Sequence, residues 1–161
     1  MGKTTVVGPG LTPEVAILPV NGVEFGLILK SPIDGLKLVH LFGSRPRGWC
    51  YTGQLMTGSF TRRFKLESVG DCTDLEDVRD KLVPFGNIPQ GQWLQVFREV
   101  YPQNDGWGPI GVADPSWVRP DDELGERFPV VYRGLLGDWR PRFGHTQNAR
   151  GVRWRWLVEV K

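Results

Sequence analysis

The stretch RGVRWRWLVEVK, residues 150–161, ends the sequence and alternates two tryptophans with arginines. In a β-strand, successive side chains point to opposite faces of the sheet. The even positions from Val152 to Val160 are all apolar and include both tryptophans, whereas the odd positions are mainly charged. The stretch therefore predicts a strand whose tryptophan face lies in a hydrophobic core, where a fully buried large side chain contributes about 1.5–3 kcal/mol. A platform on which nucleic-acid bases stack is the alternative. A membrane-binding segment is less favoured, because the polar face includes Glu159.

The length and composition are typical of one folded domain, residues 1–161. Hydrophobic residues make up 40% of the chain and charged residues 24%, and the seven tryptophans argue against disorder. The 21 glycines and 13 prolines favour many turns and short elements. No apolar run is long enough to span a membrane, and the first residues lack the apolar stretch of a signal peptide. We therefore expect a cytoplasmic protein without a membrane partner.

The cysteines and histidines indicate neither a disulfide framework nor a metal site. Cys50 and Cys72 are too few for a disulfide framework or a zinc site, and such thiols are typical of a reducing cytoplasm. His40 and His145 have no carboxylate residue at helical ligand spacing. No cofactor is expected, because the sequence contains no complete phosphate-binding loop.

Apolar runs predict strands in the first third of the sequence. Asn21-Gly22 lies between two such runs, residues 15–20 and 23–30, and this dipeptide is the strongest short-range signal for a β-hairpin. The side chains of the second run that share one face are those of Val23, Phe25, Leu27 and Leu29. Further strands are expected at residues 36–42, at 47–56 and 59–66 with a connection near Thr57-Gly58, and at 128–133.

Two helices are predicted in the middle of the sequence. Thr73 and Glu76 have the spacing of a capping box, in which each side chain accepts a hydrogen bond from the other residue's amide. Apolar residues follow at helical spacing up to Pro84, which gives a helix at about 74–83. The second helix, at about 90–101, ends before Pro102. Its apolar stripe consists of Trp93, Leu94, Phe97, Val100 and Tyr101.

These elements together predict an α+β fold. We expect a mostly antiparallel, curved sheet with both helices packed on one of its faces. Residues 104–149 show poor periodicity and many glycine, proline and charged residues, so long C-terminal loops are expected there. Long irregular segments in compact domains often carry function.

Charge is unevenly distributed, although the net charge is only +2. Residues 45–65 contain five basic and no acidic residues, and residues 133–155 contain six arginines and one aspartate. Basic residues interleaved with aromatic ones are typical of a groove for single-stranded nucleic acid. The alternative is that these segments face the acidic segments 71–80 and 114–126, within the fold or across a dimer. The arginines that would contact nucleic acid are Arg45, Arg47, Arg62, Arg63, Arg140, Arg142, Arg153 and Arg155.

Two polar residues fall on strand faces that should be buried. Arg62 is in phase with Phe60 and Phe64, and a buried arginine needs a carboxylate partner or an anionic ligand. The alternatives are a β-bulge that turns the side chain outward, or an aliphatic stem that carries the guanidinium to the sheet edge. His40 is in phase with Leu38 and is either a hydrogen-bonded core residue or a ligand-binding one.

The loop GPIGVADPSW, residues 108–117, is a further candidate for ligand binding. Its small residues let the backbone approach a ligand closely. Asp114 offers a carboxylate and Trp117 a flat apolar face, which suits the rim of a small-ligand pocket. The alternative is an Asp-Pro turn that places Trp117 in the core.

These features favour a non-catalytic module that binds a small ligand or a protein partner between the sheet, the helices and the loop 108–117. Nucleic-acid binding is the first alternative. The second is an enzyme acting on a small anionic or polar substrate, with Asp114 or His40 as acid or base and Arg62 holding an anion; residue types alone support it. A homodimer is expected, because symmetric homo-oligomers are common.

Overall fold

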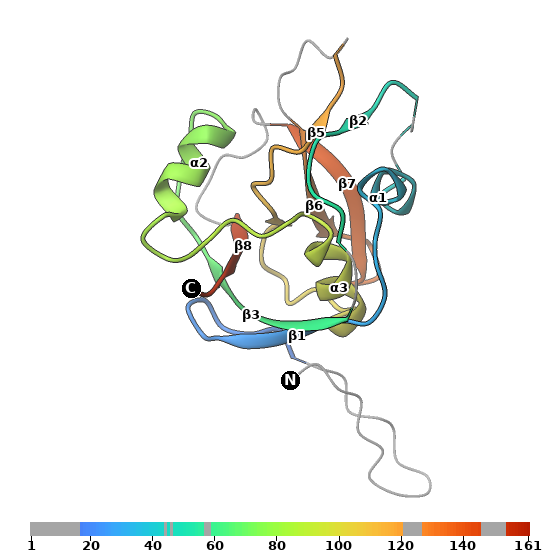
Figure 1. Cartoon of the computed structure of the whole chain (residues 1–161). Helices are drawn as coiled ribbons and strands as arrows, with labels where there is room; N and C mark the ends of the chain where they lie inside the picture. Colours follow the sequence, from blue (N-terminus) through green and yellow to red (C-terminus); the bar gives the residue numbers. More distant parts are fainter. Residues whose placement is uncertain (1–16, 44, 46, 57–58, 121–126, 146–153) are drawn as a thin grey trace, which may run out of the picture.

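The computed structural model describes residues 17–43, 45, 47–56, 59–120, 127–145 and 154–161 (Figure 1). Its centre is a six-stranded sheet with the strand order β1-β3-β8-β4-β6-β7. Neighbouring strands run antiparallel, apart from β4 and β8, which are parallel. The strands are β1 (Phe25–Leu29), β3 (Phe60–Glu67), β4 (Ile110–Gly111), β6 (Arg127–Arg133), β7 (Trp139–His145) and β8 (Arg155–Glu159).

A two-stranded sheet and three helices complete the described part of the protein. The small sheet pairs β2 (Cys50–Tyr51) with β5 (Trp117–Val118). The helices are α1 (Gly35–Leu41), α2 (Leu75–Leu82) and α3 (Trp93–Val100). The predicted α+β class with a mostly antiparallel sheet is therefore confirmed. The six-stranded sheet is open, with β1 and β7 at its edges, and it is not strongly curled, so the expected curvature is not confirmed.

The C-terminal strand β8 lies inside the sheet, between β3 and β4, and both its faces are buried. Trp154 and Trp156 are 6% and 1% exposed and share an apolar cluster with Phe128 of β6. Leu157, the next residue, belongs to a second apolar cluster. The prediction that the tryptophans form part of the core is confirmed. Arg155, which was expected on a polar face, is also buried, because a strand inside a covered sheet has no solvated side.

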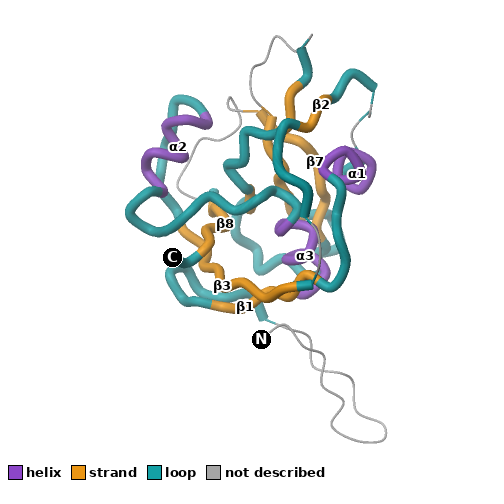
Figure 2. The backbone as a smooth tube through the Cα atoms, in the orientation of Figure 1, coloured by secondary structure: helices purple, strands orange, loops and turns teal. Residues whose placement is uncertain are grey.

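The helices α2 and α3 pack into these two different clusters. The buried side chains of α2 share the cluster of Trp156, whereas those of α3 share the cluster of Leu157. Adjacent residues of a strand point to opposite faces. The expectation that both helices pack on one face of the sheet is therefore not confirmed, and Figure 2 shows α2 and α3 well apart.

Residues 36–42 do not form the expected strand, because they belong to α1. The Asp34 carboxylate accepts a hydrogen bond from the Leu36 amide, at 2.8 Å, and so caps the start of the helix. Gly43, with a φ of 69°, follows the last turn and ends the helix. Leu38 and Val39 are buried, a pattern that a helix satisfies and an alternating strand does not.

A turn forms at Asn21-Gly22 as predicted, but the segments on its two sides do not pair with each other as the strands of a hairpin. The Val23 amide donates to the Val20 carbonyl, at 3.1 Å, and Gly22 has a φ of 79°. A type I′ hairpin turn needs positive φ at both central residues, and no described residue other than glycine has one. β1 pairs with β3 instead. Residues 17–20 are not a strand, and residues 15–16 lie outside the described residues.

The two predicted helices are present, but the first is capped one residue later than expected. Asp74, not Thr73, is the N-cap: its carboxylate accepts from the Asp77 amide at 2.8 Å. The Asp77 carboxylate in turn accepts from the Thr73 amide at 3.0 Å. The two reciprocal hydrogen bonds of a capping box are therefore present. The carboxylates of Asp74 and Asp77 accept them, and not the side chains of Thr73 and Glu76 as expected.

The described residues of the segment 104–149 are more regular than the expected long loops. The segment contains β4 and β5, of two residues each, and the longer hairpin of β6 and β7. Strand 128–133 is confirmed as β6, and strand 59–66 as β3. Strand 47–56 is reduced to β2, which pairs with β5 rather than β3. The connection at 57–58 lies outside the described residues.

Candidate functional site

The structure places the two candidate residues of the loop 108–117 in the interior. Asp114 is 5% exposed and accepts hydrogen bonds from the amides of Gly91, at 2.8 Å, and Ser116, at 3.0 Å. Trp117 is 1% exposed, and its indole N–H donates to the Gly35 carbonyl at 2.7 Å. The two side chains link the loop to the first residue of α1 and to the segment that precedes α3. This arrangement corresponds to the alternative of an Asp-Pro turn with a core tryptophan.

A buried polar contact beside this loop joins β2 to the start of α3. Gln92 is fully buried, and its side-chain amide donates to the Tyr51 hydroxyl at 2.9 Å. The Tyr51 hydroxyl donates to the Gln54 carbonyl at 3.1 Å. Burial raises the pKa of Tyr51 above its ordinary value, so the hydroxyl stays protonated and able to donate at neutral pH. The contact fixes the position of α3 relative to the small sheet.

Arg62 lies on the predicted face of β3 but is not buried. Its side chain is 51% exposed, and its Nη1 forms an ion pair with Oε1 of Glu159 at 2.7 Å. The guanidinium also lies 5.1 Å from the centre of the Phe60 ring. The aliphatic stem thus carries the charge outward, which was the alternative interpretation. The prediction of a buried arginine is wrong.

His40 is exposed on α1, not buried on a strand face. The expected alternation fails because residues 36–42 are helical, which places His40 beside the buried pair Leu38 and Val39 rather than in phase with them. No hydrogen bond or ion pair in the described part of the protein joins His40 to Asp114 or Arg62. Arg62 instead pairs with Glu159, and Asp114 accepts from Gly91 and Ser116, so these contacts do not link the three enzyme candidates to one another.

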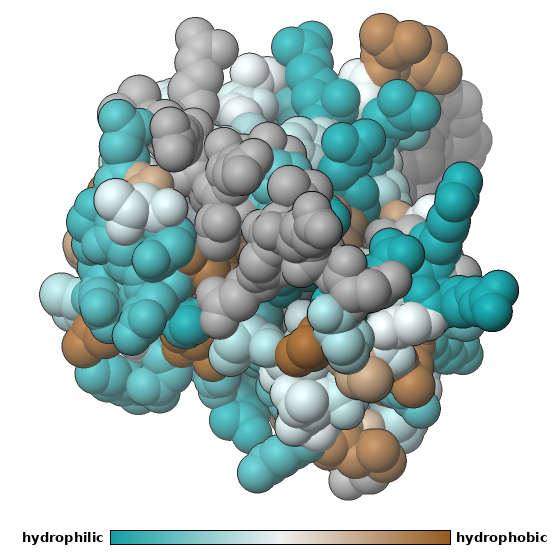
Figure 3. Space-filling view, turned by 90° about the horizontal axis from the view of Figure 1, so that it is seen from above, coloured by the Kyte–Doolittle hydropathy of each residue, from teal (hydrophilic) through white to brown (hydrophobic). Residues whose placement is uncertain are grey.

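The arginines predicted to contact nucleic acid do not form one free basic surface. Arg155 is 3% exposed and binds Asp105, and Arg63 pairs with Glu24 at 3.2 Å. Arg153 lies outside the described residues. Arg62 and Arg63 are exposed but paired with carboxylates, and the other exposed members are Arg45, Arg47, Arg140 and Arg142. In the face that Figure 3 shows, hydrophobic side chains form separate patches among hydrophilic ones, without one dominant patch among the coloured atoms.

A groove of about 440 Å³ lies between the end of β1, α1 and α3. Small-molecule sites have volumes of roughly 300–1,000 Å³ and combine apolar walls with a few polar groups. The apolar lining residues are Ile28, Leu29, Pro32, Ile33, Leu41, Val96 and Val100. The polar lining residues are Lys30, Ser31, Lys37, Gln95 and Glu99. The volume of the groove falls within this range, and its lining is a mixture of apolar, polar and charged residues.

Gln95 is the unusual residue of this groove. The residue is 7% exposed, and its amide nitrogen donates to the Glu99 carboxylate at 2.9 Å. A carboxylate only accepts hydrogen bonds, so the amide nitrogen must face Glu99 and the amide oxygen must point elsewhere. That oxygen is buried and has no hydrogen-bond partner in the described part of the protein. An unsatisfied buried acceptor costs about 1–3 kcal/mol.

The charged side chains of the groove come from three parts of the fold. Lys30 follows β1, and Lys37 lies on α1; both are exposed, and neither forms an ion pair with another described residue. Glu99, on α3, is held by Gln95. The groove thus combines two ammonium groups without described carboxylate partners, from the end of β1 and from α1, with an acceptor pair, Gln95 and Glu99, on α3.

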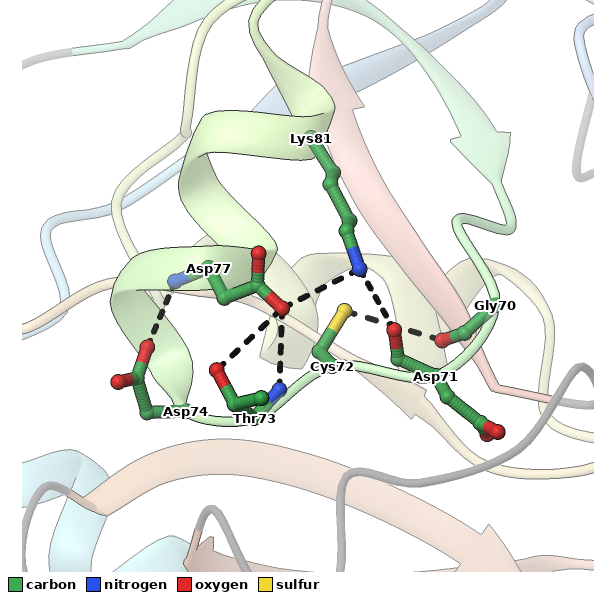
Figure 4. A network of polar contacts seen from close by, with 7 residues as sticks. All are labelled: Gly70, Asp71, Cys72, Thr73, Asp74, Asp77 and Lys81. Atoms are coloured by element: carbon green, nitrogen blue, oxygen red, sulfur yellow. Dashed lines mark hydrogen bonds and ion pairs between the residues drawn. The ribbon is translucent and has the colours of Figure 1, made fainter.

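A second, more open cavity lies at the start of α2, and its polar groups satisfy one another (Figure 4). The Asp77 carboxylate forms an ion pair with Lys81 at 3.2 Å, and Lys81 donates to the Asp71 carbonyl at 2.6 Å. The hydrogen bond from the Thr73 amide is the main reason why the pKa of Asp77 is lowered. Burial raises the pKa of the Cys72 thiol, which keeps it protonated and unreactive. This network is a helix cap.

Comparisons with known proteins identify no relative of this protein: no family model, no curated protein and no solved structure matches it. Among the described residues, no helix is long and apolar enough to cross a membrane. The same residues contain no group of three or more histidine, cysteine or acidic side chains that could hold a metal ion.

The sequence did not indicate this groove. Its α1 wall consists of residues for which the sequence pattern predicts a strand at 36–42 and not a helix. One signal was present: Gln95 and Glu99 stand four residues apart on a helix, which places them side by side next to the predicted apolar stripe.

Proposed function

We propose that the protein is a non-catalytic binding module that holds a small molecule in the groove between β1, α1 and α3. The observation that carries this proposal is Gln95, a residue that lines the groove and whose buried amide oxygen lacks a hydrogen-bond partner among the described residues. A molecule with an N–H or O–H group would satisfy this oxygen and gain the hydrogen bond without a competing partner. The apolar side chains would cover the rest of the molecule.

The proposal favours a small molecule over a protein partner because the feature is concave. Protein interfaces of standard size cover roughly 800 Å² on each partner. The groove instead has the volume of a drug-sized ligand site. The loop 108–117, which was the expected rim, is not among the lining residues.

A screen of small compounds by thermal denaturation tests the proposal with two variants of Ile28. This residue is 53% exposed, so Ile28→Trp should fold while it fills the groove, and Ile28→Val leaves the groove open. A ligand at 100 times its Kd adds about 2.7 kcal/mol of stability, a shift of roughly 5–10 °C. We expect compounds that stabilise the wild type and Ile28→Val but not Ile28→Trp. Stabilisation that persists in Ile28→Trp would place the binding site elsewhere.

Nucleic-acid binding is the second candidate, and the observation that favours it is the exposure of Arg45, Arg47, Arg140 and Arg142. Its signature is an affinity that falls steeply with salt concentration. Fluorescence anisotropy with a labelled oligonucleotide at about 50 and 200 mM salt tests this candidate. Absence of binding at the lower concentration would remove it.

A further inference from the structure

We infer that the ligand of the groove is a small zwitterion with an apolar side chain, of the size of an amino acid or a dipeptide. This inference rests on the proposed function, because it names the chemical class of the molecule that the same groove holds. Three features of the groove carry it: the two lysines, the acceptor pair on α3 and the apolar walls.

The lysines specify an anionic group. Lys30 and Lys37 come from different elements and line one groove, and neither has an ion-pair partner among the described residues. Two ammonium groups that share a groove repel each other, and a carboxylate between them removes this repulsion. Hydrogen bonds between charged groups are also stronger than neutral ones. The anionic end of the ligand therefore lies near these lysines.

The acceptor pair specifies a cationic donor. Gln95 lines the groove and has a buried amide oxygen for which the described residues supply no donor, and the carboxylate of Glu99 already accepts one hydrogen bond from Gln95. An ammonium group carries three donors and a positive charge. It can donate to the Gln95 oxygen and form an ion pair with Glu99. A simple fatty acid would leave the Gln95 oxygen unsatisfied, and a simple amine would leave both lysines without a counter-charge.

The apolar walls specify an aliphatic body between the two charged ends. Ile28 and Leu41 are 53% and 38% exposed, and Val96 lines the groove next to Gln95. Covering exposed apolar surface of this kind contributes to binding. An amino acid or dipeptide with aliphatic side chains supplies an ammonium group, a carboxylate and an apolar surface in one molecule.

Three related peptides test the inference by isothermal titration calorimetry. Leucyl-leucine has both charges, N-acetyl-leucyl-leucine has only the carboxylate, and leucyl-leucine amide has only the ammonium group. We expect leucyl-leucine to bind about tenfold or more tightly than either blocked peptide, since each loses a charge-assisted hydrogen bond. Equal binding of the acetylated peptide would overturn the inference in favour of a site that recognises only a terminal carboxylate. If leucyl-leucine amide binds as tightly as leucyl-leucine, the inference is overturned in favour of a site that recognises only an ammonium group.

Variants of the groove assign each charge. Lys30→Gln with Lys37→Gln should weaken leucyl-leucine about tenfold or more, whereas Lys161→Gln, an exposed lysine outside the groove, should not. Gln95→Met should reduce the difference between leucyl-leucine and its acetylated form. Thermal melts of the variants without ligand serve as the control that each variant is folded. Unchanged affinity in a folded double lysine variant would contradict the inference.

The outcomes separate this inference from the proposed function. If none of the three peptides binds but other compounds stabilise Ile28→Val and not Ile28→Trp, the ligand class is wrong and the groove remains a binding site. If no compound distinguishes the two Ile28 variants, both proposals fail.

Discussion

Arg155 and Asp105 form a bidentate ion pair, with Nη1–Oδ2 and Nη2–Oδ1 distances of 3.0 and 2.9 Å. Arg155 is 3% exposed in β8, and Asp105 lies in the loop that precedes β4. The Arg155 Nε atom is buried without a hydrogen-bond partner, so the guanidinium depends on this one carboxylate among the described residues. The ion pair fastens the loop 103–107 to the centre of the sheet.

Asp105→Ala should destabilise the protein by about 2–4 kcal/mol, because it leaves a buried guanidinium without a counter-charge. This loss of stability is smaller than that expected for a fully buried ion pair, because the Asp105 side chain is 28% exposed. Adding Arg155→Met should restore much of the loss, since the double variant buries no charge. Urea denaturation of both variants measures these differences. A loss for Asp105→Ala of less than about 1 kcal/mol would show that the ion pair is not structural.

Trp156→Ala should destabilise the protein by about 3–5 kcal/mol, because it leaves a large cavity in the apolar cluster of β8. Trp107→Ala is the matched control: Trp107 is 55% exposed, and the Arg155 guanidinium lies 5.8 Å from its ring centre. The control should cost about 1 kcal/mol or less. Similar losses for the two variants would contradict the placement of Trp156 in the core.

Gly35→Ala should destabilise the protein by about 1–3 kcal/mol, because a methyl group there would meet a ring that cannot move away. A Cβ atom at Gly35 would overlap the ring of Tyr51, and Gln92 and Gln54 hold the hydroxyl of that ring. Gly26→Ala is the control, because the nearest atom to its Cβ is 4.0 Å away. Equal thermal melting of both variants would show that α1 and β2 are not packed as described.

Stability should fall at alkaline pH, because burial raises the pKa of Cys72, Tyr51 and Tyr101 above their ordinary values of 9.0, 10.0 and 10.0. The unfolded protein therefore releases these protons first as the pH rises. The free energy of unfolding is unaffected by these groups below their ordinary pKa values and decreases above them. Urea denaturation at about pH 7 and about pH 10.5 measures the difference.

Tyr101→Phe is the informative variant for this pH dependence. The buried Tyr101 hydroxyl has no described hydrogen-bond partner, so its removal should leave the stability at neutral pH unchanged or higher. The alkaline loss should become smaller, because one of the three ionising groups is gone. An unchanged alkaline loss would assign the effect to other groups.

The elements that the sequence predicted correctly have strong local periodicity. The tryptophan face of β8 follows the two-residue period of a strand, and α2 and α3 follow the helical period. α1 was missed because Leu36, Leu38, His40 and Phe42 alternate like a strand, and the deciding residues, Asp34 and Gly43, lie just outside that window. β4 and β5, with two residues each, are too short to show a period.

The groove could not be predicted from local patterns because its walls come together only in the fold. Lys30 and Gln95 are far apart in the sequence, and the position of Lys37 depends on α1 being a helix. The burial of Arg155 likewise depends on β8 lying between β3 and β4, which no property of its own sequence reveals. The residue types in the sequence suggested ligand binding, and the tertiary structure shows the groove for which we propose it.

The most direct test of the central claim is an NMR titration of protein with labelled isoleucine methyl groups, using the compounds that stabilise it. Ile28 and Ile33 line the groove, whereas Ile110 is fully buried in β4 and serves as the reference. If the groove is the binding site, the Ile28 and Ile33 methyl resonances shift in a saturable manner while that of Ile110 stays nearly unchanged. A stabilising compound that reaches saturation without shifting Ile28 or Ile33 would contradict the claim.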